Sequence, residues 1–194
     1  FQRDQILELM RQVQIPSPER QLGKFPHEFS GGQRQRVLIA KALSTMSALI
    51  IADEPTTALD VTIQAQILRL LRTLVKERGI SVLFITHDFG VVARICDRVT
   101  VMYAGQDVEE SDVADLFERP SHPYTRKLID TLPDRQKEEI RGIPGSVPTL
   151  VNPPGGCRFH PRCDGAMPVC SQRRPDMIII GKNHRVRCYL FKDR

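Results

Sequence analysis

Leu49–Glu54, with the sequence Leu-Ile-Ile-Ala-Asp-Glu, is the stretch that decides the fold. An apolar run without polar alternation is typical of a strand buried in a parallel sheet. A helical pattern follows from Asp60, a good N-cap residue, to about Arg78, and Gly79 then marks its end. The second apolar run is Ile80–Ile85. Strand, helix and strand in this order form a βαβ unit, so we predict an α/β fold with a parallel sheet and a right-handed connection.

Further elements are predicted around this unit from apolar spacing and turn residues. The helix that begins at Ser30 is expected to turn Val37, Leu38, Ala42 and Leu43 toward the core. A β-hairpin is predicted over 99–109, with its turn at Ala104-Gly105. Other helices are expected near 1–13, 89–96, 111–117 and 123–131. From Pro133 the chain becomes rich in Pro and Gly, so we divide it into residues 1–132, a linker at 133–156, and a cysteine-containing extension at 157–194 that we expect to be small and irregular.

Composition is that of a soluble globular chain: 194 residues, 41% hydrophobic and 26% charged. The apolar runs are about five or six residues, far shorter than the roughly 20 of a membrane-spanning helix. Residues 157–194 contain 9 Lys/Arg against 3 Asp/Glu, so they hold the excess positive charge. Such a patch suits nucleic acid, an anionic membrane surface or an acidic protein, although a solvated tail explains it equally well.

Phe29–Gln33, with the sequence Phe-Ser-Gly-Gly-Gln, opens the helix before the first strand. Ser30 and Gln33 have the spacing of a capping box, which is a purely structural explanation. The two glycines each weaken a helix by about 1 kcal/mol, which is understandable if the bare backbone approaches another group closely. Because helix N-termini suit anions, a phosphate contact is the functional alternative.

Two carboxylates, Asp53 and Glu54, follow the first strand, and His87 follows the second. The carboxyl ends of parallel strands share one rim of the sheet, where α/β proteins bind ligands. Paired carboxylates there favour a division of roles, in which Asp53 holds Mg²⁺ through water and Glu54 polarises a nucleophilic water. His87 is placed to hydrogen-bond a phosphate or that water. A capping or solvent-exposed role remains the structural alternative for each.

Taken together and in order, these motifs resemble the ATP-binding subunits of ABC transporters. Phe29–Gln33 is similar to the signature motif, with Phe where Leu is commoner, and Leu49–Glu54 is similar to Walker B. Ala58–Asp60 resembles the D-loop and His87 the switch histidine. The family's fold is a P-loop NTPase-like sheet with helices, of which this chain would form part, because the phosphate-binding pattern G-x-x-x-x-G-K-[ST] occurs nowhere in its 194 residues.

The resemblance implies roles for these residues. Glu54 and His87 would be catalytic, and Asp53 would hold Mg²⁺ through water. Nucleotide would be contacted by Ser30, Gly31, Gly32, Gln33, Asp53 and Asp60. The four signature residues would reach ATP bound by a second ATPase subunit, and Asp53, Glu54 and His87 would act on ATP held by their own subunit. We expect the chain to be a fragment of a longer polypeptide and, alone, to show no ATPase activity above a Glu54→Gln control.

The extension contains four cysteines, Cys157, Cys163, Cys170 and Cys188. Disulfides are unexpected in a cytosolic nucleotide enzyme, and the short C-x₂₋₄-C spacing usual for zinc is absent. An iron–sulfur cluster also takes four thiolates, whose charge the neighbouring Arg158, Arg162 and Arg187 would offset. A cluster, zinc and unligated thiols therefore all stay open from the residues alone.

The family resemblance extends into this segment. His122–Tyr124, Ile143–Gly145 and Gly156–Cys163 are similar to the C-terminal extension of oligopeptide/dipeptide importers, which implies a [4Fe–4S] cluster on the four cysteines. It also implies permease partners, a peripheral position on the cytoplasmic face of the cell membrane, and no nucleic acid. Two alternatives are a cluster- or metal-stabilised interaction module that needs a partner's Walker A loop, and a soluble ABC ATPase acting on nucleic acid.

Overall fold

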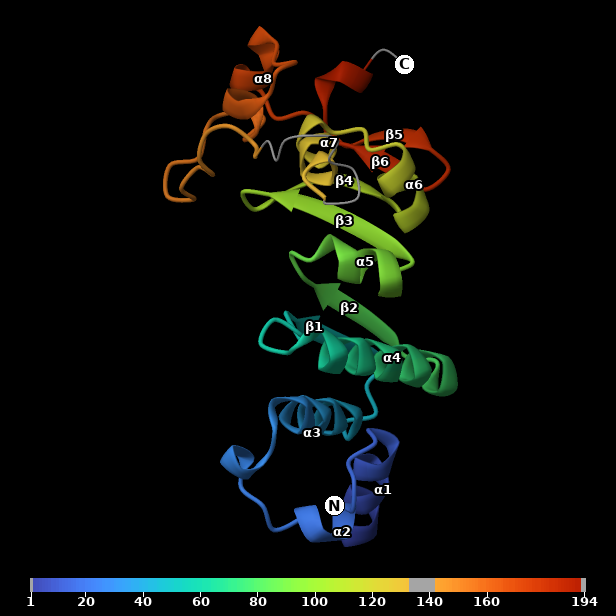
Figure 1. Cartoon of the computed structure of the whole chain (residues 1–194). Coiled ribbons are helices and arrows are strands. Elements are labelled where there is room, and N and C mark those ends of the chain that lie inside the picture. Colours follow the sequence, from blue (N-terminus) through green and yellow to red (C-terminus); the bar gives the residue numbers. More distant parts are fainter. Residues whose placement is uncertain (1, 133–141, 193–194) are drawn as a thin grey trace. The chain divides into compact units, whose positions relative to one another are not determined.

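The computed structural model describes residues 2–132 and 142–192. The chain forms two compact units, Phe1–Ile95 and Cys96–Arg194 (Figure 1). Within the described residues, no helix is both long and apolar enough to cross a membrane.

The first unit is a small α/β assembly around one pair of strands. Strand β1 (Leu49–Asp53) and strand β2 (Ser81–Ile85) pair in parallel, in register from Leu49–Ser81 to Asp53–Ile85. Helix α4 (Val61–Arg78) connects them, which confirms the predicted βαβ unit. The remaining elements are α1 (Arg3–Gln12), α2 (Pro18–Gln21), the 3-10 helix η1 (Pro26–Glu28), α3 (Gly31–Leu43) and α5 (Phe89–Ile95).

Local sequence signals set the ends of the two longest helices. Ser30 caps α3 in a complete capping box with Gln33, in which Gln33 N donates to Ser30 Oγ at 3.3 Å and Ser30 N donates to Gln33 Oε1 at 3.1 Å. Asp60 caps α4, because Ile63 N donates to Asp60 Oδ1 at 2.9 Å. Gly79 ends α4 in the left-handed conformation, with φ of 63°. Each boundary matches its predicted residue.

The core of this unit joins α1, α3 and α4. Ile67, Leu70, Leu71 and Leu74 of α4 are buried there, with Ile63 at the margin. The buried side of α3 differs from the prediction, because Ile39 and Ala40 lie inside while Leu38 is 57% exposed.

Arg36 is also buried. Its guanidinium donates to Val13 O at 2.8 Å, Gln14 Oε1 at 3.1 Å and Gln66 Oε1 at 3.3 Å, so it ties the three helices together.

The prediction that the apolar run beginning at Leu49 forms a buried strand is wrong in this unit. Only Ala52 of β1 is buried, and Leu49 and Ile51 are 51% and 63% exposed. Leu83 and Ile85 of β2 are similarly exposed, at 51% and 46%. The reason is that Ile50 and Phe84 pack against the helical core on one face, whereas the alternate residues lie on the other face.

The second unit is built on a four-stranded antiparallel sheet with the order β3-β4-β6-β5. Strands β3 (Arg98–Tyr103) and β4 (Gln106–Asp112) form the predicted hairpin, and its turn residues Ala104 and Gly105 have φ of 47° and 75°. The other elements are α6 (Val113–Glu118), α7 (Pro123–Asp130), the 3-10 helices η3 (His160–Arg162) and η4 (Tyr189–Phe191), α8 (Pro168–Gln172), β5 (Ile178–Gly181) and β6 (His184–Val186).

The C-terminal segment is more regular than the sequence indicated. Strand β6 pairs with β4, placing Val186 opposite Glu109, so residues from both sides of the proposed 133–156 linker share one sheet. Within that linker, residues 142–156 contain no helix or strand, and 133–141 lie outside the described residues.

Candidate functional site

The rim at the carboxyl ends of β1 and β2 brings Glu54 and His87 together. Glu54 follows β1 directly, and its N–H donates to Ile85 O at 2.9 Å. Its φ of 43° lies in the left-handed region, which is uncommon outside glycine. His87 Nδ1 is 3.0 Å from Glu54 Oε1, and the Thr57 hydroxyl donates to Glu54 Oε2 at 3.0 Å. Both carboxylate oxygens therefore have a partner, and Thr57 is a residue that the sequence did not single out.

This rim is open to solvent. The side chains of His87 and Glu54 are 74% and 47% exposed. The hydrogen bond from His87, followed by that from Thr57, lowers the pKa of the Glu54 carboxyl below its usual value. Glu54 is therefore ionised at neutral pH, as a group that polarises water must be. Asp53, at the last position of β1, is also exposed.

Helix α3 presents Ser30, Gly31, Gly32 and Gln33 beside α4 and the turn before it. A Cβ atom added to Gly32 would lie 2.6 Å from Ile63 Cγ2, whereas one added to Gly31 would lie 3.4 Å from Leu59 Cδ2. Gly32 is therefore packed closely against Ile63 within this unit. The polar atoms of Ser30, Gln33 and Asp60 serve as helix caps, and no hydrogen bond in the described part of the chain links them to Glu54 or His87.

The four cysteines of the second unit line one small cavity. Cys157, Cys163, Cys170 and Cys188 border a space of about 10 Å³, which is room for about one water molecule. None is in a disulfide. Burial, with a further contribution from neighbouring thiols, raises the pKa of Cys157 and Cys163, and that of Cys188 to about 11. Among residues 2–132 and 142–192, no group of three His, Cys, Asp or Glu side chains has the arrangement needed to hold a metal ion.

The arginines expected to offset thiolate charge have other partners. Arg187 donates to Asp107 Oδ1 at 3.0 Å and Oδ2 at 2.8 Å. Arg162 donates to Ile143 O at 2.8 Å and Pro144 O at 2.7 Å. The guanidinium of Arg158 donates to the carbonyl oxygen of Ala104. These side chains fasten the segment around the cysteines to the hairpin and to the residues before Gly145.

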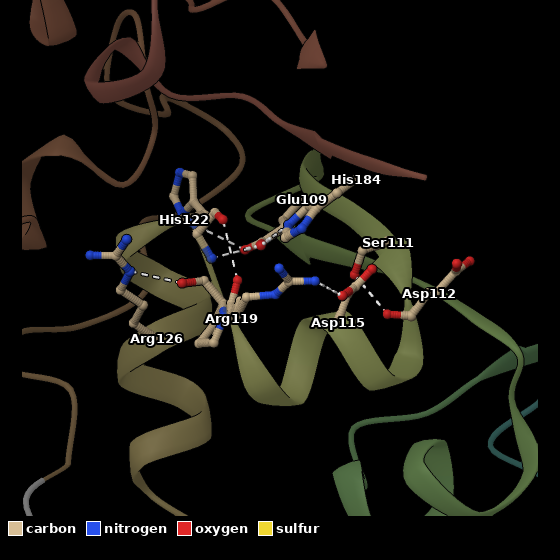
Figure 2. Close-up of polar contacts among 10 residues, drawn as sticks. Glu109, Ser111, Asp112, Asp115, Arg119, His122, Arg126 and His184 are labelled. Atoms are coloured by element: carbon tan, nitrogen blue, oxygen red, sulfur yellow. Dashed lines mark hydrogen bonds and ion pairs between the residues drawn. The ribbon is translucent and has the colours of Figure 1, made fainter. Parts of the chain in front are cut away.

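A buried polar network, which the sequence reasoning missed, centres on Glu109 of β4 (Figure 2). Glu109 is 0% exposed. Its Oε1 accepts from Ser121 N at 2.7 Å and is 2.7 Å from His184 Nε2, and its Oε2 accepts from His122 N at 2.9 Å. The network joins β4, β6 and the start of α7. A Glu beside apolar Val108 gave no local signal of burial, because its partners lie up to 75 residues away.

Comparison with protein families matches both parts of the chain. The ABC transporter model matches residues 2–57, and the model described as oligopeptide/dipeptide transporter, C-terminal region, matches residues 108–170. The α/β unit with its Glu54–His87 rim thus carries the fold of an ABC ATPase. The chain belongs to the ABC transporter family of ATP-binding proteins, and to the oligopeptide/dipeptide group within it.

Curated relatives agree with this assignment. The chain is 52% identical over 189 residues to a probable peptide ABC transporter ATP-binding protein, y4tR, of Sinorhizobium fredii, covering 96% of this chain and 56% of the relative. It is 51% identical to the oligopeptide transport ATP-binding protein OppD of Bacillus subtilis, covering 95% and 52%. The chain therefore spans about half the length of the curated relatives it matches.

Solved structures give the same fold. CbiO1 of Clostridium perfringens, part of an ABC transporter complex, is 32% identical with a TM-score of 0.54, over 60% of this chain and 45% of CbiO1. A dimeric bacterial ABC transporter cassette is 36% identical with a TM-score of 0.50, over 57% and 47%. Both support the predicted α/β class.

Proposed function

We propose that this chain is the part of an ATP-hydrolysing subunit that supplies the hydrolytic rim and the signature helix, and that the subunit drives import of dipeptides or oligopeptides. The observation that carries the proposal is the Glu54–His87 pair, 3.0 Å apart at the ends of two parallel strands. Ionised Glu54 polarises the attacking water, and His87 hydrogen-bonds the terminal phosphate or that water. The peptide substrate is suggested by the names of the relatives.

The remaining site residues complete this assignment. Asp53 holds Mg²⁺ through water, and Asp60 lies in the D-loop beside the nucleotide. The signature residues Ser30, Gly31, Gly32 and Gln33 contact ATP bound by a second ATPase subunit, which suits their place at a helix N-terminus. Such a pair works with transmembrane permease subunits on the cytoplasmic face of the cell membrane. Relatives named as peptide transport proteins favour this function over nucleic-acid binding.

The test is ATP hydrolysis by the subunit that carries this chain, assembled with its second ATPase subunit and permease. Glu54→Gln keeps the shape of the side chain but removes its charge, and we expect hydrolysis to fall by about 10²–10⁴-fold, the range for a lost general base. His87→Ala is expected to lower it similarly. The 194-residue chain alone, which has no phosphate-binding loop pattern, is expected to match its Glu54→Gln variant. Full hydrolysis by the assembled Glu54→Gln protein would refute the proposed roles.

We further propose that Cys157, Cys163, Cys170 and Cys188 hold a [4Fe–4S] cluster. The donor set suits it, because four unpaired thiols border one cavity. Each thiolate of such a cluster binds a different iron atom, so the thiols need not converge as they must on a single ion. The cavity between them has room for about one water molecule, so a bound cluster requires the four thiols to lie farther apart than they do here. Bound, the cluster would supply a cross-link between β6 and the loops around η3 and α8. Iron and labile-sulfide assays on anaerobically prepared protein test this, and stoichiometric zinc without iron would reject it.

A further inference from the structure

Glu54 has a strained backbone at the point where the rim is built. Its φ of 43° lies in the left-handed region, which is unfavourable for a residue with a Cβ atom. Such strain persists only where neighbouring groups over-determine the conformation, and it concentrates at functional sites. The groups that fix Glu54 therefore indicate what its conformation is for.

Backbone hydrogen bonds hold Glu54 in this conformation from two sides. Its N–H donates to Ile85 O at 2.9 Å, which ties it to the end of β2. Its carbonyl oxygen accepts from Thr57 N at 3.3 Å, which closes a turn over residues 54–57. Thr56, inside this turn, is buried, so the turn is packed against the unit. The turn brings Thr57 back to the side of Glu54.

The side chain of Thr57 adds a contact to the carboxylate itself. Its hydroxyl donates to Glu54 Oε2 at 3.0 Å, while His87 Nδ1 is 3.0 Å from Oε1. The two partners come from different segments, the turn after β1 and the residues after β2. An ionised carboxylate only accepts and has about four lone-pair sites, so each oxygen keeps a site for a water molecule. The carboxylate is thus fixed in orientation without being saturated.

We propose that Thr57 is a positioning residue for ATP hydrolysis, whose hydroxyl holds Glu54 Oε2 so that the carboxylate directs its remaining lone pairs at the attacking water. The inference rests on the proposed role of Glu54. The terminal torsion of a Glu side chain is broad, so a contact from His87 to one oxygen leaves the plane of the carboxylate free to turn. A second contact, to the other oxygen, fixes that plane. Orientation matters because a displacement of about 1 Å can lower a rate 10²-fold.

A purely structural role for the Thr57 side chain predicts different behaviour. Thr57 is exposed, and its backbone N–H closes the turn without the hydroxyl. Removal of the hydroxyl should therefore leave the fold intact. The hydrogen bond from His87, followed by that from Thr57, lowers the pKa of the Glu54 carboxyl. Loss of the Thr57 bond should raise this pKa and move the acidic limb of the kcat profile to higher pH.

The test compares variants of the subunit that carries this chain, assembled with its second ATPase subunit and permease. Thr57→Val removes the hydroxyl but keeps the shape of the side chain, and Thr57→Ser keeps a hydroxyl. Thr73→Val makes the same change at an exposed threonine of α4 and serves as the matched control. For each variant, kcat and KM for ATP are measured against pH, and the thermal unfolding midpoint is measured alongside.

We expect Thr57→Val to lower kcat by about 10-fold, a smaller loss than the 10²–10⁴-fold of a missing general base, with KM for ATP unchanged. Its acidic limb should lie at higher pH than that of the parent. Thr57→Ser should recover most of the rate, and Thr73→Val should change neither the rate nor the pH profile. An unchanged kcat in Thr57→Val, or a loss that Thr57→Ser does not recover, would overturn the inference.

A double variant tests whether Thr57 acts through Glu54. In the Glu54→Gln background, Thr57→Val should not lower the residual rate further, because the carboxylate that it positions is already absent. An equal fall in both backgrounds would show that Thr57 acts independently of Glu54, which contradicts the inference but leaves the proposed role of Glu54 standing. If Glu54→Gln alone hydrolyses ATP at the full rate, the proposed function fails first, and this inference fails with it.

Discussion

The two units use polar side chains in opposite ways. In Phe1–Ile95 the groups at the sheet rim are exposed, with His87 at 74% and Glu54 at 47%. In Cys96–Arg194 the central carboxylate, Glu109, is fully buried and accepts hydrogen bonds on both oxygens. An exposed pair of side chains at the strand ends is available to an external ligand. A buried carboxylate with hydrogen bonds to both oxygens instead holds secondary-structure elements together. Stability measurements can therefore distinguish the two kinds of site.

The largest expected effect is at Glu109. Glu109→Ala leaves the N–H groups of Ser121 and His122 and the ring of His184 without their acceptor in a buried site. We expect a loss of about 3–5 kcal/mol in the free energy of unfolding, as for a broken buried pair. Urea unfolding followed by circular dichroism measures it.

The matched control for Glu109 is the surface pair between Asp115 and Arg119 of the same unit (Figure 2). The two residues are four apart on or next to helix α6, so Asp115→Ala should cost about 0.5 kcal/mol or less. Equal losses in the two variants would contradict the special role assigned to Glu109.

We expect His122 to make the free energy of unfolding depend on pH. Burial lowers its folded pKa to about 4, from 6.5 when unfolded, so folding releases a proton as the pH falls below 6.5. The stability that this residue contributes is complete above pH 6.5 and is lost as the pH falls toward 4, by about 3 kcal/mol at 1.36 kcal/mol per pKa unit. His122→Asn should flatten the dependence of the urea midpoint on pH between 6.5 and 4. An identical slope in parent and variant would show that His122 does not titrate with folding.

A smaller effect separates the two signature glycines. Gly32→Ala places a Cβ 2.6 Å from Ile63 Cγ2, so either the Ile63 side chain or helix α4 must shift. Overpacking of this kind costs typically about 1–3 kcal/mol, reduced by the better helix propensity of Ala. Gly31→Ala meets Leu59 only at 3.4 Å and should be neutral or slightly stabilising. If thermal unfolding midpoints rank the two variants in the opposite order, the packing explanation for Gly32 is wrong.

The sequence predicted what local signals encode. The βαβ unit followed from two apolar runs and a capped helix, and Ser30, Asp60 and Gly79 form the predicted boundaries. The rim holding Glu54 and His87 followed from the rule that parallel strands end on one edge. Each inference depended on residues within one or two elements, where spacing alone decides the geometry.

Long-range features were missed for a physical reason. The pairing of β6 with β4 joins residues about 75 apart, and nothing in the basic, cysteine-containing segment marks a partner at that distance. The burial of Arg36 gave no signal in the sequence, because its acceptors are the backbone carbonyl of Val13 and the side-chain amide oxygens of Gln14 and Gln66, with no acidic residue among them. The exposed side of β1 was missed because an all-apolar run predicts burial on both faces.

The smallest expected effect on stability is at the rim. It tests most directly the difference between the exposed Glu54–His87 site and the buried Glu109 site. Because His87 is exposed and its partner Glu54 is also accessible to water, an ion pair there adds little to stability. His87→Ala should leave the unfolding midpoint of the chain unchanged within error. If the proposed function holds, the same substitution should abolish most ATP hydrolysis by the assembled subunits. A variant that unfolds as readily as Glu109→Ala would place His87 among the structural groups, because a residue kept for an external nucleotide has no reason to stabilise the fold in its absence.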